Sequence, residues 1–114
     1  MSEGFVVKAE EIGAFFTEKL LILGLNEKEI ADFNEFWVPE LTKSGKPYIF
    51  VTFYSQERID REAPLKVTPK PDSVIRVFFD HAELDAPIQT KEQVLLPAER
   101  KGFAVIEWGG RRYK

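Results

Sequence analysis

After a short strand-like run at residues 4–8, the hydrophobic pattern of this chain changes from the period of a helix to the period of a strand. Apolar residues recur every three to four positions in residues 9–24 and 25–42, which predicts two amphipathic helices. Residues 47–54, 73–80 and 103–108 are instead rich in β-branched and aromatic side chains, which favours strands. The intervening turns are too short for helical crossovers. The sequence therefore predicts an α+β fold, with two N-terminal helices packed on a mainly antiparallel sheet of about four to five strands.

The helix boundaries carry the clearest local signals. Gly24 is a natural stop for the first helix, because glycine adopts the left-handed conformation that ends many helices. Asn26, with Glu29 three residues later, matches a capping box, in which both side chains satisfy backbone N–H groups at a helix start. Pro39 disfavours helical geometry at the residue before it, so we expect the second helix to bend or end there.

Other segments carry weaker signals. Residues 4–8 and 65–68 alternate like short strands, and the second is expected at an edge of the sheet. The last strand is expected to stop at the glycine pair that follows it. The remaining expectations are a mixed-charge loop or short helical turn (residues 55–64), a reversal (80–87), and a weak strand or extended loop (88–97).

The length and composition limit the class of protein. The 114 residues fit a single domain, 1–114, formed alone or as one half of a longer native protein. With 44% hydrophobic residues the chain can bury a substantial core. The net charge of -3 is small and both signs are interspersed, which gives no electrostatic support for nucleic-acid binding. Cysteine is absent, which excludes disulfides and thiolate metal sites. No apolar run approaches the ~20 residues that insertion across a membrane requires.

Two residues of opposite charge, Arg76 and Glu107, each interrupt an otherwise apolar strand. An isolated charge in such a position costs several kcal/mol, and a guanidinium–carboxylate contact offsets much of that cost. We therefore predict that the two strands are neighbours and that Arg76 and Glu107 form a structural ion pair. Two alternatives stay open: both residues face solvent, or they have a binding or catalytic role.

Few other residues indicate chemistry. His81 is the only histidine and follows Asp80, but the spacing of the nearby acids matches no zinc or calcium motif. We therefore predict no metal and no cofactor, and we assign no residue as catalytic. Trp37, Tyr54 and Trp108 are candidates for an exposed aromatic platform that binds a ligand. The competing interpretation places the tryptophans in the core, because a chain with 10 phenylalanines builds its interior from aromatic rings.

Five blocks of sequence follow one another in a recognisable order. They are Gly-Phe-Val-Val-Lys (4–8), Leu-Asn-Glu-Lys-Glu-Ile (25–30), Phe-Trp-Val-Pro (36–39), Pro-Lys-Pro-Asp-Ser-Val-Ile-Arg-Val-Phe (69–78) and Glu-Arg-Lys-Gly-Phe-Ala-Val-Ile-Glu-Trp-Gly-Gly (99–110). Together they resemble the C-terminal half of a family of uncharacterised bacterial proteins, whose members end in a Gly-Phe-x-Val-x-Glu-Trp-Gly-Gly motif. The relatives also carry an N-terminal β-rich half with a Lys-Pro-Val-Ile-Tyr-Leu-Tyr-Pro-like segment. The resemblance implies an extracytoplasmic or cell-surface parent protein, and it implies no catalytic residue.

These observations favour a non-enzymatic interaction or binding domain that is part of a larger bacterial protein. Strands that are apolar on both faces would need cover from a second copy in a homodimer, from the N-terminal half of the parent protein, or from another ligand. The alternative function is a small hydrolase that uses acidic residues near Glu107 or in the Asp80-His81 loop.

Overall fold

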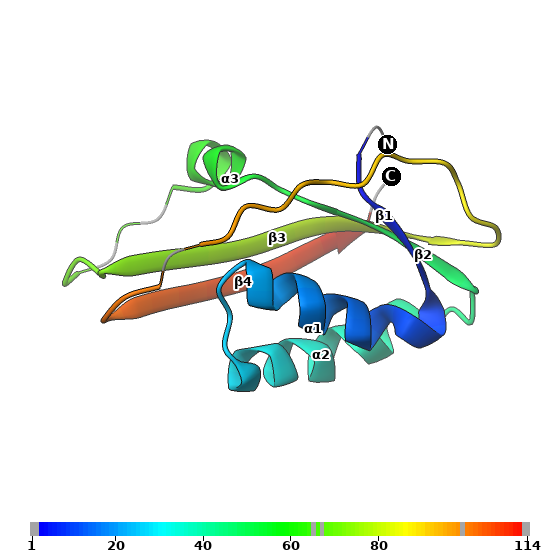
Figure 1. Ribbon diagram of the computed structural model, residues 1–114, viewed down its shortest axis with the longest axis horizontal. Coiled ribbons are helices and arrows are strands. Elements are labelled where there is room, and N and C mark those ends of the chain that lie inside the picture. The colour runs from blue at the N-terminus through cyan, green and yellow to red at the C-terminus, as the bar shows by residue number, and fades with distance from the viewer. Residues whose placement is uncertain (1–2, 65, 67, 99, 113–114) are drawn as a thin grey trace.

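The computed structural model describes residues 3–64, 66, 68–98 and 100–112. It confirms the α+β fold, with three α-helices and a four-stranded sheet (Figure 1). In chain order the elements are β1 (Phe5–Lys8), the 3-10 helix η1 (Ala9–Glu11), α1 (Ile12–Ile22), α2 (Glu27–Thr42), β2 (Tyr48–Phe53), α3 (Gln56–Glu62), β3 (Ser73–Leu84) and β4 (Ala104–Arg112).

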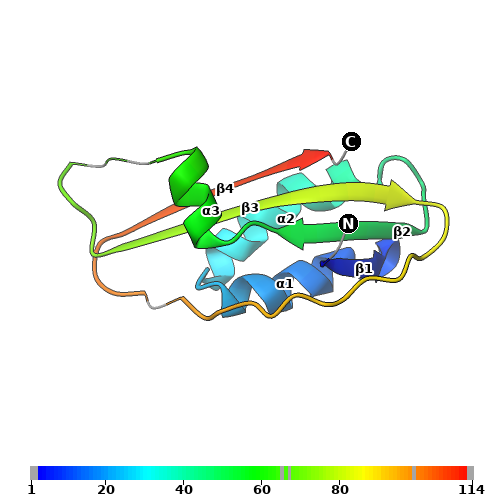
Figure 2. The same cartoon turned by 90° about the horizontal axis from the view of Figure 1, so that it is seen from above.

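The sheet is mixed and mostly antiparallel, with the strand order β1-β2-β3-β4. The β1–β2 and β2–β3 pairs are antiparallel, whereas β4 runs parallel to β3. A parallel neighbour requires the chain to return to the end of the sheet at which β3 began. The described residues of this return, 85–98 and 100–103, form no helix, and residues 85–98 follow the β1 margin of the sheet, opposite β4 (Figure 2).

α1 and α2 lie against one face of the sheet and α3 against the other (Figure 1). The layer beneath the sheet is built from aromatic rings: Phe16 contacts Phe33 with ring centroids 4.9 Å apart, and both reach Phe79 of β3, at 5.4 and 5.9 Å. All three residues are fully buried. Edge-on and tilted aromatic pairs of this kind contribute about 0.5–1.5 kcal/mol each beyond their burial, so the helices are fixed to the sheet by ring packing.

The capping box and the stop at Gly24 are confirmed, whereas an end of the second helix at Pro39 is wrong. Asn26 Oδ1 accepts from the backbone N–H of Glu29, and Glu29 Oε1 accepts from that of Asn26, both at 2.9 Å. Gly24 lies two residues after the end of α1 and adopts a φ of 104°. Pro39, however, lies inside α2, which continues to Thr42. The lost backbone hydrogen bond costs about 3 kcal/mol, and it is offset because the last turn buries Leu41 almost completely.

The strands extend further than their sequence patterns predict. β3 runs to Leu84, so the expected reversal at residues 80–87 is wrong in its first half: the antiparallel pairing with β2 holds Asp80 and His81 in the sheet. β4 continues through Gly109 and Gly110 to Arg112, because its pairing with β3 supplies backbone partners along the whole length. The mixed-charge segment forms a true helix, α3.

Two weaker predictions meet different outcomes. Leu65 and Val67, in the short strand expected at residues 65–68, lie outside the described residues, and the described Lys66 and Thr68 belong to no strand. Residues 88–97 are an extended loop rather than a strand. This loop has one isolated bridge, from Lys91 to Glu3.

The two edges of the sheet differ in their cover. At the β1 edge, the Lys91 carbonyl accepts from Gly4 N–H at 2.9 Å. Beyond the start of β1, the Gln93 side chain bonds to β2 instead: Oε1 accepts from Phe53 N–H at 2.8 Å and Nε2 donates to Phe53 O at 2.9 Å. β4 forms the other margin (Figure 2).

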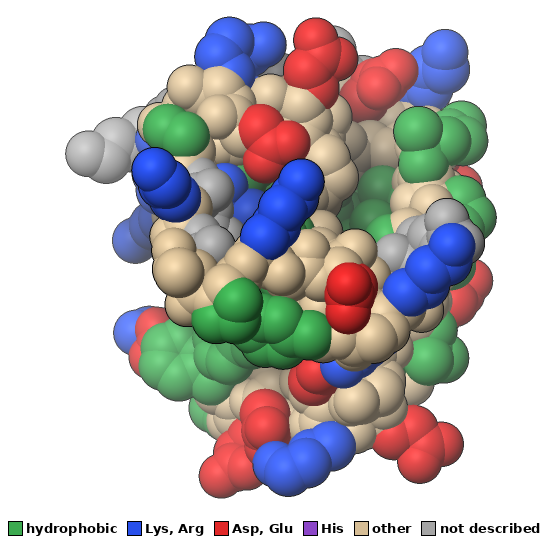
Figure 3. Space-filling view, turned by 90° about the vertical axis from the view of Figure 1, so that its left-hand side faces the viewer, with side chains coloured by type: hydrophobic (Ala, Val, Ile, Leu, Met, Phe, Trp, Pro, Cys, Tyr) green, Lys and Arg blue, Asp and Glu red, His purple; other side chains and the backbone are tan. Residues whose placement is uncertain are grey.

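The end of the molecule at which β3 and β4 begin shows hydrophobic side chains among charges of both signs (Figure 3). Phe103 and Val74 contribute exposed apolar surface here. Ser73 closes this end: its Oγ donates to Lys101 O at 3.0 Å and accepts from Lys101 N–H at 2.7 Å. The start of the β3–β4 pair is therefore held by side-chain as well as backbone contacts.

Candidate functional site

Arg76 and Glu107 face each other across β3 and β4, where the parallel register pairs their Cα atoms. The guanidinium donates to Glu107 Oε1 through Nε at 3.1 Å and through Nη2 at 2.9 Å. Nη1 lies 3.7 Å from Asp60 of α3, beyond hydrogen-bond distance. The Arg76 side chain is 4% exposed and that of Glu107 37%. The pair therefore buries one charge and leaves the other partly in water.

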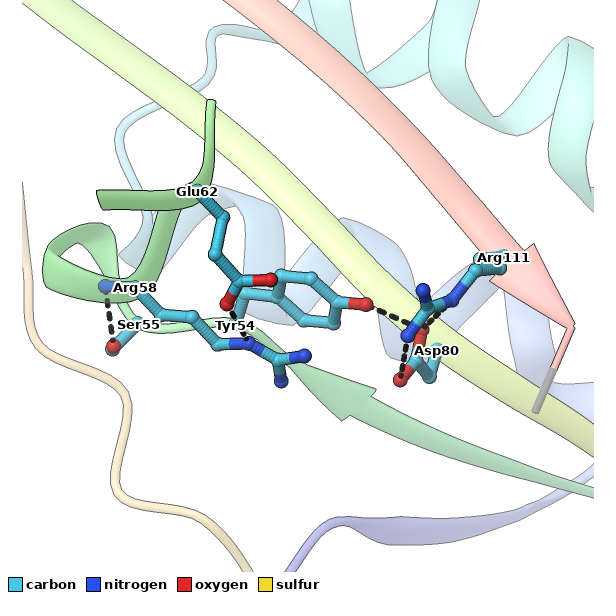
Figure 4. A network of polar contacts seen from close by, with 6 residues as sticks. All are labelled: Tyr54, Ser55, Arg58, Glu62, Asp80 and Arg111. Atoms are coloured by element: carbon cyan, nitrogen blue, oxygen red, sulfur yellow. Dashed lines mark hydrogen bonds and ion pairs between the residues drawn. The ribbon is translucent and has the colours of Figure 1, made fainter. Parts of the chain in front are cut away.

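A second polar group lies further along the same face, around Asp80 (Figure 4). The hydroxyl of Tyr54 donates to Asp80 Oδ1 at 2.8 Å. Arg111, near the end of β4, donates to the same oxygen through Nε at 3.2 Å and to Oδ2 through Nη2 at 3.4 Å. Asp80 is buried, whereas Arg111 is mostly exposed. The carboxylate thus has a neutral donor on one side and a cationic donor on the other.

α3 places a further cation against Tyr54. Ser55 caps this helix by accepting from the backbone N–H of Arg58 at 3.1 Å. The Arg58 guanidinium lies 3.8 Å from the centre of the Tyr54 ring and contacts Glu62 Oε2 at 2.6 Å (Figure 4). Burial raises the pKa of Tyr54, and the hydrogen bond to the Asp80 carboxylate raises it further. Tyr54 therefore stays a neutral donor rather than an acid.

Tyr54 and Arg111 line a groove beside β4. This groove of about 220 Å³ runs between Tyr54 and β4, and its wall is formed by Tyr54, Phe78, Phe79, Gly109, Gly110 and Arg111. Neither Glu107 nor Asp80 lines it. A substrate in this groove would meet apolar atoms and one guanidinium but no carboxylate, so the groove does not present the acids of a hydrolytic site.

The three aromatic candidates do not form one platform. Trp37 is buried on the helix face, with its ring 4.9 Å from Phe79. Trp108 is half-buried on the same face, 5.3 Å from Phe33. Tyr54 lies on the opposite face, with Asp80. Trp37 is therefore a core residue, and of the two tryptophans only Trp108 reaches the surface.

Asp80 and His81 point to opposite faces of β3, as consecutive strand residues must. His81 is buried against Trp37, and its Nδ1 lies 3.1 Å from Glu83 Oε1, without the alignment of a hydrogen bond. Burial lowers the pKa of His81, and the Glu83 carboxylate opposes that shift. The two side chains of the expected Asp80-His81 loop therefore cannot act on one substrate atom.

The outer edge of β4 has no backbone partner among the residues that the structure describes. The carbonyl of Phe103 accepts from Ser73 N–H at 3.1 Å, so the backbone groups of Phe103 point toward β3. Since successive residues of a strand alternate, those of Ile106, Trp108 and Gly110 point outward. In the part of the chain that the structure describes, no backbone group bonds to them.

Apolar surface borders this edge on the helix side. Phe36 of α2 is 52% exposed, and its ring lies 6.0 Å from that of Trp108. Sequence reasoning missed this surface and also missed Arg111, because it expected the last strand to stop at the glycine pair before this residue. The available signal was the spacing of Glu107 and Arg111, which places both on one face once the strand is known to continue through the glycines.

Among residues 3–64, 66, 68–98 and 100–112, no group of three or more histidine or acidic side chains could hold a metal ion. No helix in the described ranges is long and apolar enough to span a bilayer. Comparison with protein-family models, curated proteins and solved structures finds no match to this chain.

Proposed function

We propose that this chain is a non-enzymatic interaction domain whose binding surface is the outer edge of β4 together with Phe36 and Trp108. The observation that carries the proposal is the difference between the two sheet edges. Lys91 and Gln93 bond to Gly4 and Phe53 on the β1–β2 side, whereas along the whole of β4 the outward backbone groups bond to no described residue. An open edge of this kind is a template for a strand from another chain.

The side chains beside the edge support binding through a strand. Phe36 and Trp108 supply apolar contact area next to the backbone groups. Glu107 and Arg111 supply one charge of each sign on the opposite face of the strand. Backbone hydrogen bonds would give the affinity, and these side chains would select the partner.

Hydrogen exchange followed by NMR tests whether the edge is available. In dilute protein, we expect the amides of Ile106, Trp108 and Gly110 to exchange rapidly. The amides of Val105 and Glu107 serve as the matched control within the same strand, and we expect them to be protected by β3. Slow exchange of the outward amides at low protein concentration would show that another part of the chain covers the edge, and the proposal would fail.

The hydrolase alternative is tested on the same protein. If the acids were catalytic, purified protein would cleave chromogenic ester, phosphate or glycoside substrates, and Glu107→Gln would abolish the turnover while unfolding cooperatively like a folded domain. We expect no turnover above that of a heat-denatured sample. Neither acid lines the groove next to Tyr54, which is the physical reason for ranking binding first.

The proposal extends to the parent protein. The resemblance to the C-terminal half of a bacterial family supports a domain that works as part of a larger extracytoplasmic or cell-surface protein. On this proposal the partner strand comes from the N-terminal half of that protein or from a second copy of this chain.

A further inference from the structure

The residues on the two sides of Gly109 form a self-complementary charge pattern. Glu107 lies two residues before Gly109 and Arg111 two residues after it, and both side chains are on the α3 face of the sheet. In a two-fold symmetric contact, residue i of one copy meets residue j of the other and the reverse also holds. An antiparallel β4–β4 pair with its two-fold axis at Gly109 therefore places each Glu107 opposite an Arg111.

We propose that the occupant of the β4 edge is β4 of a second copy of this chain, paired antiparallel about Gly109 to give one eight-stranded sheet. This inference rests on the proposed function, because it assigns a partner to the same edge. Alternative registers lose the charge match: an axis at Trp108 places Glu107 opposite Gly109, and an axis at Glu107 places the two carboxylates opposite each other.

The backbone geometry fits this register. The outward-facing residues Trp108 and Gly110 become the hydrogen-bonded pairs, with Trp108 of each copy opposite Gly110 of the other. Glu107 and Arg111 then fall at non-hydrogen-bonded positions, where facing side chains approach most closely. Trp108 lies over a residue without a side chain, an arrangement that shields the glycine backbone.

Both charged side chains have capacity for a second contact. Glu107 bonds Arg76 through Oε1 alone, and its side chain is 37% exposed. Arg111 bonds Asp80 through Nε and Nη2, and its side chain is 68% exposed. In the described part of the chain, Glu107 Oε2 and Arg111 Nη1 take part in no hydrogen bond. In the dimer, the Arg76–Glu107 pair of one copy would contact the Arg111–Asp80 pair of the other copy. Positive and negative side chains would then alternate from one copy to the next.

A disulfide tests the register, because the chain has no cysteine of its own. Gly109→Cys places a thiol at the two-fold axis, where the non-hydrogen-bonded Cα atoms lie about 4.5 Å apart, within the range of disulfides. A Cβ at Gly109 meets only Phe78, at 3.6 Å, which is an ordinary contact. Arg112→Cys is the matched control: it is exposed on the same strand, but its two copies would lie about 20 Å apart.

With oxidised glutathione as the oxidant, we expect Gly109→Cys to form a covalent dimer at least about tenfold faster than Arg112→Cys at equal concentration. In the Gly109→Cys protein, adding Arg111→Glu should slow the reaction by about tenfold, because it replaces two attractive pairs with two repulsive ones. Sedimentation velocity of the unmodified chain should show a monomer–dimer equilibrium. Cooperative unfolding of each variant verifies that it is folded.

Three outcomes would overturn the inference. If the chain stays monomeric and the two cysteine variants react equally slowly, a second copy does not occupy the edge. If a dimer forms without faster crosslinking at position 109, the copies associate in another register or through another surface. If Arg111→Glu leaves the crosslinking rate unchanged, the charge pairing is wrong. In each case rapid exchange of the outward β4 amides still supports the proposed function, and slow exchange in dilute monomer rejects it, so the two failures are distinguishable.

Discussion

Arg76 and Glu107 are opposite each other in the parallel register of β3 and β4, with 2.9 Å between Nη2 and Oε1. The guanidinium is buried, and the carboxylate is its only hydrogen-bonding acid among the described residues. The pair couples the register of the two strands to the neutralisation of a buried charge. A slip by one residue would move Arg76 away from its acid.

Glu107→Gln should destabilise the domain by about 1–3 kcal/mol, because the buried guanidinium loses its charged hydrogen-bond acceptor and keeps only Asp60, 3.7 Å away, as a charged partner. The double change Arg76→Met with Glu107→Leu should recover most of that loss, since it removes both charges. Urea unfolding measures both values. Glu62→Gln, in the exposed pair with Arg58, is the control and should stay within about 0.5 kcal/mol of the unmodified protein. Equal losses of unfolding free energy in Glu107→Gln and Glu62→Gln would show that the buried pair stabilises the domain no more than the exposed pair does.

Adjacent glycines in β4 should respond in opposite ways to a methyl group. A Cβ at Gly110 would lie 2.6 Å from Phe79 and 2.8 Å from Trp37, whereas one at Gly109 meets Phe78 at 3.6 Å. We expect Gly110→Ala to lower stability by about 1–3 kcal/mol through overpacking. Gly109→Ala should be neutral or slightly stabilising. Thermal or urea unfolding compares the two, and a Gly109→Ala effect as large as that of Gly110→Ala would contradict the packing described.

The side-chain amide of Gln93 should be required to protect the backbone of Phe53 from hydrogen exchange, since β1 does not reach this part of β2. Gln93→Ala leaves Phe53 N–H and C=O without the contacts at 2.8 and 2.9 Å, which should cost about 1–2 kcal/mol. The Phe53 amide should also exchange faster. Gln89→Ala, in the same loop but exposed, is the control and should change neither quantity. Unchanged Phe53 exchange in Gln93→Ala would show that the side chain does not cover the edge.

His81 should make stability fall on the acid side of neutrality. Burial lowers its pKa in the folded domain, partly opposed by Glu83 and Asp80 and assisted by Arg112. Because the unfolded state then binds a proton first, the stabilisation is full above the unfolded pKa of about 6.5 and is lost as the pH falls toward the folded value. His81→Gln should flatten this part of the curve. The free energy of unfolding is measured from about pH 8 to about pH 5 for the unmodified protein and for His81→Gln. Equal slopes of this free energy against pH in the two proteins would exclude His81 as the cause.

Local signals in the sequence were sufficient where only neighbouring residues decide the structure. The capping box needs nothing beyond four consecutive residues, Asn26 to Glu29, and the stop at Gly24 depends on one backbone conformation. Both were predictable because their hydrogen bonds close within a single turn. The Arg76–Glu107 contact could be anticipated for a different reason: two unpaired charges in apolar strands need each other wherever the strands meet.

Long-range pairing decided what local patterns could not. β3 continues through His81 because β2 supplies backbone partners as far as Leu84. Helix α2 passes Pro39 because burying Leu41 outweighs one lost hydrogen bond. Neither effect is visible in the residues on either side of the boundary, since both depend on an element distant in the sequence.

The sequence by itself determined the α+β class and the helix caps, because hydrophobic period and capping chemistry are local properties of the chain. Only the tertiary structure decided that β4 runs parallel to β3, that Trp37 and Tyr54 lie on opposite faces, and that loop residues bond to Gly4 and Phe53 at one sheet edge while the outward groups of β4 bond to no described residue. The contacts at the β1–β2 edge come from Lys91 and Gln93 of one loop, and a loop path is set by long-range contacts such as Gln93 with Phe53 rather than by any repeating pattern.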